Sequence, residues 1–134
     1  METSRFRQLL GAYSCVVEQA GKIKHELEGT GLRPLLWLVE SHPDDLRGAT
    51  VADKVIGRAA AALLITHGAT VVYGKLMSNG ARDWLREHDI ELYYDELIPA
   101  ILRRDRTGVC PMEQLAADCK VPSETVKKIL LHVS

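Results

Sequence analysis

Two polar stretches of the chain have the residue types and spacing of helix starts that bind anions. The first covers residues 48–58, where Asp53 and Gly57 come just before a run of alanines and leucines. The second covers residues 104–113 and contains arginines, a Thr-Gly pair and a Cys-Pro pair. The first backbone N–H groups of a helix have no partner within the helix, so they bind phosphates and carboxylates. If both starts meet at one cleft, the chain has a binding site for a nucleotide or another anion.

The first stretch predicts a helix that opens near Thr50 and continues through the apolar residues 59–65. Thr50 and Asp53 have the spacing of a capping box, in which side chains bind the free N–H groups of the first turn. On such a helix Gly57 lies one turn beyond Asp53 on the same face. Asp53 then either satisfies the helix start or accepts a hydrogen bond from a ligand hydroxyl, such as a ribose. Gly57 leaves room for a ligand or for close packing of a strand.

The second stretch predicts a helix that begins at Pro111, because proline suits the first helical position. Cys110 is then the cap, and Glu113 is the third residue of the helix. A thiol at a helix start beside arginines has a lowered pKa, which makes Cys110 a candidate catalytic nucleophile or attachment point. The alternative is a buried, inert cysteine.

The residues just before Pro111 are candidates for phosphate binding. Arg104, Thr107 and Gly108 would hold a phosphate together with the backbone N–H groups that follow Pro111. The alternative is a solvated basic turn that Asp105 neutralises. The pattern is not that of a phosphate-binding Walker loop.

The remaining sequence predicts an α/β domain that spans residues 1–134, with 111–134 as a C-terminal helical pair. A hairpin is expected at 14–28, because Ala20-Gly21 suits a two-residue turn between two strand-like segments. Segments 69–74 and 90–94 are predicted strands, and the helix between them, capped by Ser78 or Asn79, makes them a parallel pair. We expect a mixed sheet with helices on both faces.

Residues 53–61 and 104–113 are similar to a small prokaryotic family of unknown function with a cytidine-deaminase-like fold, and the resemblance covers about residues 1–115. It implies a three-layer α/β/α sandwich around a five-stranded mixed sheet, without an assigned reaction. Zinc deaminases need His-x-Glu or Cys-x-Glu, and then Pro-Cys-x-x-Cys. The chain has neither His-x-Glu nor Cys-x-Glu, and it has Cys110-Pro111 in reverse order, with Glu113 at the position of the second cysteine. We therefore expect no zinc deaminase chemistry and no metal.

The five histidines and two tryptophans give little further signal. The histidines are far apart in the sequence, and none is three or four residues from another, so surface or helix-capping roles are expected. Trp37 and Trp84 lie on predicted helix faces and are expected in the core. The histidines are His25, His42, His67, His88 and His132.

Composition narrows the class of protein. The formal net charge of −1 gives no long-range attraction to nucleic acid or to an anionic membrane. The three cysteines are an odd number without close spacing, which argues against a disulfide framework. The N-terminus has no apolar signal segment, and the run 59–65 is too short to span a bilayer. These features favour a cytoplasmic protein with no cofactor.

The function that this pattern favours is a binding module for a nucleotide or an ADP-ribose-like molecule. One alternative is an enzyme that uses Cys110. A second alternative is a DNA-binding regulator, because residues 114–126 resemble a helix-turn-helix in which Ser123 opens the recognition helix. The small number of positive charges in this region argues against DNA binding.

Overall fold

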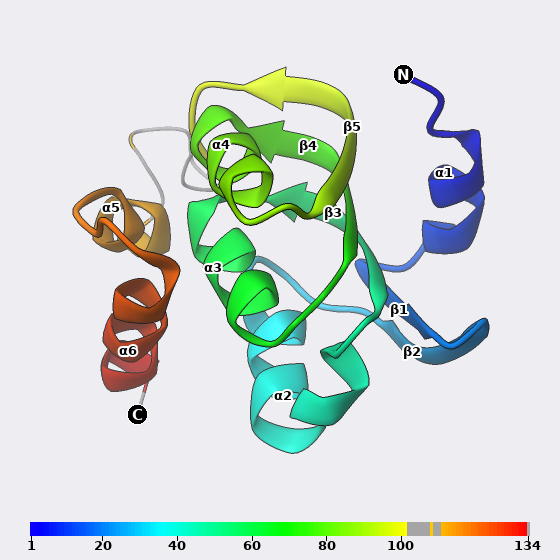
Figure 1. Ribbon diagram of the computed structural model, residues 1–134, viewed down its shortest axis with the longest axis horizontal. Helices are drawn as coiled ribbons and strands as arrows, with labels where there is room; N and C mark the ends of the chain where they lie inside the picture. Colours follow the sequence, from blue (N-terminus) through cyan, green and yellow to red (C-terminus); the bar gives the residue numbers. More distant parts are fainter. Residues whose placement is uncertain (102–107, 109–110, 134) are drawn as a thin grey trace.

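The protein is described here by a computed structural model, which covers residues 1–101, 108 and 111–133. Figure 1 shows the arrangement of its helices and strands. In chain order these are α1 (Ser4–Leu10), β1 (Cys15–Gln19), β2 (Lys22–Leu27), α2 (Arg33–Ser41), the 3₁₀ helix η1 (Pro43–Leu46), β3 (Thr50–Ile56), α3 (Arg58–Thr66), β4 (Val71–Ser78), α4 (Asn79–Glu87), β5 (Glu91–Ile98), α5 (Pro111–Ala117) and α6 (Pro122–Val133).

The strands form one five-stranded mixed sheet in the order β2-β1-β3-β4-β5. Strand β1 is antiparallel to both β2 and β3, whereas β3, β4 and β5 are parallel to one another. The hairpin turn has positive φ at both of its central residues, 54° at Ala20 and 78° at Gly21. A tight two-residue turn requires such angles. The predicted hairpin and the predicted parallel pair are both confirmed.

Helices cover both faces of the sheet, as expected. Phe6 and Leu10 of α1 pack on one face against Val16, Ala52 and Tyr73. Helices α2, α3 and α4 cover the other face, and α5 and α6 pack on the outer side of α3 (Figure 1). Helix α3 is therefore enclosed, which explains why its residues 59–64 are apolar on every side and each is at most 3% exposed.

The predicted start of this central helix is wrong. Residues 50–56 form β3, a strand in the middle of the sheet that pairs with β1 on one side and β4 on the other. Its β-branched residues favour a strand, and the ladders on both sides satisfy its backbone. The capping-box pattern of Thr50 and Asp53 is thus coincidental, and α3 begins only after Gly57.

The other predicted helix starts agree with the structure. The Ser78 Oγ accepts a hydrogen bond from the Ala81 N–H at 3.1 Å and so caps α4. Helices α5 and α6 form the predicted C-terminal pair. In the part of the chain that the structure describes, no helix has the length and apolar character needed to cross a membrane.

Candidate functional site

The starts of α3 and α5 meet through the carboxylate of Glu113. Its Oε2 accepts a hydrogen bond from the Arg58 N–H at 2.8 Å, and its Oε1 accepts one from the Ala59 N–H at 3.0 Å. These are the first two residues of α3, whose N–H groups have no partner inside the helix. The first turn of α3 therefore binds an acidic side chain of the protein itself. The sequence did not predict this contact, because it placed the helix start near Thr50 and expected a ligand anion.

Gly57 makes room for this contact. Its φ of −96° and ψ of −178° are extended, so conformational freedom does not require a glycine here. Lack of space does require one, because a Cβ atom at this position would overlap the Glu113 carboxylate and would lie 2.7 Å from Cγ1 of Ile101. The glycine thus permits close approach of the Glu113 side chain to the start of α3, which is neither the ligand nor the strand packing that the sequence suggested.

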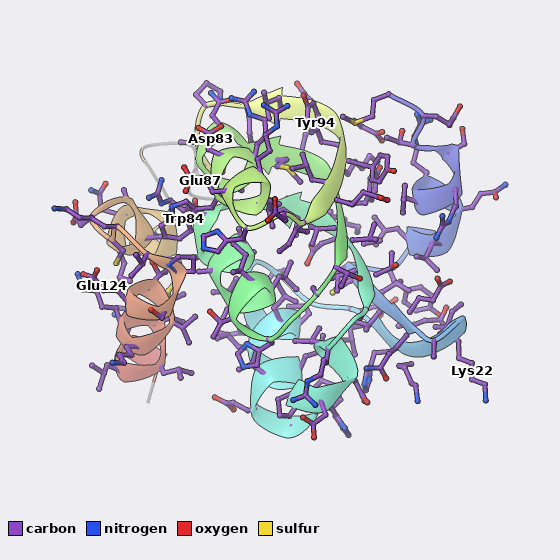
Figure 2. All side chains as sticks on the ribbon, viewed as in Figure 1. Lys22, Asp83, Trp84, Glu87, Tyr94 and Glu124 are labelled. Atoms are coloured by element: carbon purple, nitrogen blue, oxygen red, sulfur yellow. The ribbon has the colours of Figure 1, made fainter. Side chains whose placement is uncertain are left out.

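Arg58 is held between the helices. Its guanidinium carbon lies 3.8 Å from the centre of the Trp84 ring, which is a cation–π contact. Its Nη2 donates to the Cys119 carbonyl at 3.0 Å. Figure 2 shows Trp84 on the side of α4 that faces the C-terminal helices. Among the described residues, the buried Arg58 Nε has no hydrogen-bond partner. Arg58 thereby fixes a positive charge beside the anion-binding turn.

The start of α4 lies beside the same arginine. A Cβ atom on Gly80 would be 3.4 Å from Cδ of Arg58, so the first turn of α4 is in contact with that side chain. The starts of α3 and α4 therefore both lie beside Arg58, after the carboxyl ends of β3 and β4. Helix N-termini carry partial positive charge, and they add to the charge of the guanidinium.

Burial acts against the charge of Glu113. Burial raises the pKa of its carboxyl group, while the hydrogen bonds from Ala59 and Arg58 and the Arg58 charge act in the opposite direction. The group is 9% exposed. A buried carboxylate with two N–H donors and an arginine is the arrangement that stabilises an anion away from water.

Asp53 lies within β3 and not on a helix. It pairs in register with Cys15 of β1, and its Oδ1 accepts a hydrogen bond from the Val55 N–H at 3.2 Å. The Cys15 thiol also bonds to its carboxyl group. Burial raises the pKa of Asp53 from 3.8 to about 7. The predicted placement of Asp53 and Gly57 on one helix face is therefore wrong.

The other predicted site residues divide into two groups. Pro111 begins α5 and is exposed, and Gly108 lies at a bend and is partly exposed. Arg104, Thr107 and Cys110 lie outside the described residues, so their predicted phosphate-binding and nucleophilic roles stay predictions.

The structure also reveals a polar cluster that the sequence did not predict. His25 and His42 lie with Asp45 so that one ligand atom from each falls within 4.8 Å of the others. His42 has the expected role, because it is exposed and caps the end of α2, whereas its proximity to His25 was not predicted. Trp37, which was expected in the core, is 44% exposed and borders this cluster, whereas Trp84 is 3% exposed as predicted.

The fold and the helix starts define an α/β protein with a five-stranded mixed sheet flanked by helices. Residues 8–131 match the model of the TM1506 family, described as a domain of unknown function (DUF1893), and the chain belongs to this family. It is similar to the crystal structure of a DUF1893 family protein (TM1506) from Thermotoga maritima, with 30% sequence identity and a TM-score of 0.82. The similarity covers 89% of this chain and 80% of that one. No curated protein matches the chain.

Proposed function

We propose that the protein binds a small phosphate-bearing molecule, a nucleotide or an ADP-ribose-like compound, where α3, α4 and α5 begin. In this proposal a ligand phosphate takes the two N–H donors of α3 that bind the Glu113 carboxylate in the structure. The observation that carries the proposal is the pair of bonds from the N–H groups of Arg58 and Ala59 to a carboxylate, 2.8 and 3.0 Å long.

The place of this turn in the fold supports the proposal. Ligands of open α/β sheets bind outside the carboxyl ends of the parallel strands, where helices begin. Helix α3 follows the carboxyl end of β3, and α4 follows that of β4. Phosphates are the usual ligands of such helix starts because both the free N–H groups and the helix dipole favour negative charge.

The same proposal includes the predicted contributions of four residues that precede Pro111, the first residue of the helix that carries Glu113. These residues are Arg104, Thr107, Gly108 and Cys110. Asp53 has no ligand contact in this version of the proposal, because its oxygen atoms bond within the sheet. The cytidine-deaminase-like relationship is also part of the proposal, and it is used for the fold alone, without zinc chemistry.

Calorimetric titration with inorganic phosphate, AMP, ADP, ATP and ADP-ribose tests the proposal on the wild type and on Glu113→Ala. Removing the carboxylate frees both donors, so we expect at least one compound to bind the variant about fivefold more tightly or better, the value of about one hydrogen bond. Glu124→Ala is the matched control, because it removes one acidic side chain from the outer side of α6, where Figure 2 shows Glu124. Its affinities should equal those of the wild type.

Two results would overturn the proposal. One is the absence of binding of every compound to both the wild type and Glu113→Ala. The other is equal binding to the wild type, Glu113→Ala and Glu124→Ala, because the ligand would then bind elsewhere. Glu113→Gln, which keeps an acceptor oxygen but no charge, covers the case in which the alanine variant does not fold.

The enzyme and DNA-binding alternatives stay predictions. The thiol on which the first depends lies outside the described residues. For the second, α6 is the would-be recognition helix, and it packs on α3 through the buried residues Val126 and Ile129.

A further inference from the structure

A cluster of polar side chains lies at the β2 edge of the sheet, where β2 meets η1. Nε2 of His25 is 2.8 Å from Oδ2 of Asp45, and Nδ1 of His42 is 3.8 Å from the same oxygen. The two imidazole ring centres are 4.9 Å apart. The side chain of His25 is 12% exposed, that of Asp45 30% and that of His42 46%, so the cluster is open to solvent on one side.

Local structure directs these side chains toward one another. The β1–β2 register shifts between Val17 and Glu18, which pair with His25 and Ile23 and leave Lys24 as an extra residue. Such a bulge turns a side chain to the other face of the sheet, and it brings His25 to the face where α2 and η1 pack.

The other two groups sit on a short, fixed segment. His42 ends α2, and Pro43 opens η1, which carries Asp45. The Gln19 side-chain amide donates to the carbonyls of Asp44 and Arg47, both at 2.9 Å, and so ties η1 to the sheet. The bulge positions His25, and Pro43 and the Gln19 amide position the segment that carries His42 and Asp45.

We propose that His25, His42 and Asp45 bind a divalent transition metal ion of the zinc class, with a fourth position open to water. Around tetrahedral zinc, ligand atoms about 2.0–2.1 Å from the metal are about 3.3 Å from one another. The separations of 2.8 and 3.8 Å lie on either side of this value, and all three ligand atoms lie within 4.8 Å of one another, so rotation of the side chains would bring them onto one ion. Two imidazoles and one carboxylate suit zinc, cobalt and nickel, whereas calcium and magnesium prefer oxygen ligands.

The surroundings of the cluster fit a metal ligand set. The Trp37 ring centre lies 5.6 Å from that of His25 and 5.0 Å from that of His42. Trp37 also lines a pocket of about 340 Å³ with Leu27, Glu28, Gly29, Arg33 and Pro34. The metal would therefore lie beside a cavity of small-molecule size.

Titration of the metal-free protein with Co²⁺ and Zn²⁺ tests the proposal. We expect one ion per chain, a visible absorption band typical of four-coordinate cobalt, and a change of Trp37 fluorescence in a Trp84→Phe background. Every protein in this titration, including the one called wild type, also carries Cys110→Ser, so that the Cys110 thiol cannot bind the ion. His42→Ala removes a half-exposed side chain at the end of α2. It should weaken Zn²⁺ binding at least tenfold, because even outer-shell partners are worth about 10–100-fold.

The matched control is His132→Ala, which removes an exposed histidine from the end of α6. It should bind Zn²⁺ with the wild-type affinity. Asp45→Asn should weaken binding as His42→Ala does, and it keeps the size of the side chain. The proposal is overturned if the wild type binds no Zn²⁺ or Co²⁺, or if His42→Ala and Asp45→Asn both retain wild-type affinity within tenfold.

Discussion

Asp53→Asn should change how the stability of the protein depends on pH. Asp53 lies inside the sheet and is 6% exposed, and burial raises its pKa from 3.8 to about 7. The folded state therefore holds a proton on this carboxyl group at pH values where the unfolded chain has lost it. An asparagine keeps the acceptor oxygen for the Val55 N–H and cannot titrate.

The sign and size of the effect follow from the two pKa values. The stabilising contribution of the protonated group is complete below pH 3.8 and is lost as the pH rises through about 7. One proton gives a slope of about 1.4 kcal/mol per pH unit, so about three units correspond to about 4 kcal/mol. A domain of this size has a free energy of unfolding of about 5–15 kcal/mol, so the loss is a large part of the total.

Urea unfolding, followed by circular dichroism at several pH values between about 4 and 8, measures this difference. The free energy of unfolding of the wild type should fall relative to that of Asp53→Asn by about 4 kcal/mol across the range. Asp118→Asn, at an exposed position after α5, is the matched control and should follow the wild type. The carbon NMR signal of the Asp53 carboxyl group should titrate near neutral pH in the native protein.

Parallel pH profiles for the wild type and Asp53→Asn would refute the reasoning. They would mean that the carboxyl group has the same pKa in the folded and unfolded states, and hence that water or another charge compensates its burial. The difference between the two proteins isolates Asp53, because all other titrating groups are common to both.

Three further predictions concern single residues. Gly57→Ala should lower the free energy of unfolding, measured in urea, by about 1–3 kcal/mol, because the new Cβ would displace the Glu113 carboxylate from α3. The double variant Gly57→Ala, Glu113→Ala should lose less stability than the sum of the losses of the two single variants. Full additivity would contradict this mechanism. Ser78→Ala should cost about 1 kcal/mol through loss of the bond from Ala81, and an unchanged urea midpoint would exclude the cap. Cys15 should resist alkylation in the native protein by mass spectrometry, because burial raises the pKa of its thiol and encloses it, and labelling at the unfolded rate would contradict this.

Much of the fold is predictable from local sequence, for reasons that the structure makes clear. Gly21 accepts its positive φ readily, and this glycine between two strand-like segments is the signal for the turn, whereas Ala20 takes a positive φ that alanine rarely adopts. Ser78 is followed by an amphipathic helix that it caps. The alanine and leucine run of α3 predicts enclosure by other elements, and the sheet and the C-terminal helices supply it.

Strand β3 could not be predicted in this way, because its partners are distant in the sequence. Asp53 is disfavoured in strands, and with Thr50 it imitates a helix cap. The two ladders to β1 and β4 outweigh both local signals. The histidine cluster is hidden for the same reason: His25 and His42 are seventeen positions apart by their numbers, and only the packing of η1 on the hairpin brings them together.

At the first turn of α3, two N–H groups bind the Glu113 carboxylate, a contact that the sequence did not predict. Glu113 supplies the charge, and its helix α5 is joined to α6, which packs on α3 through Val126 and Ile129. That apolar contact does not involve the carboxylate. In the proposed site, therefore, a phosphate needs only to replace one side chain at the N–H groups of α3, and the C-terminal helices can stay in place. The affinity gain of Glu113→Ala measures the cost of this replacement, and the urea midpoint of the same variant measures how much the carboxylate stabilises the fold. If the two quantities are similar in free energy, the phosphate and the carboxylate compete for the same two donors.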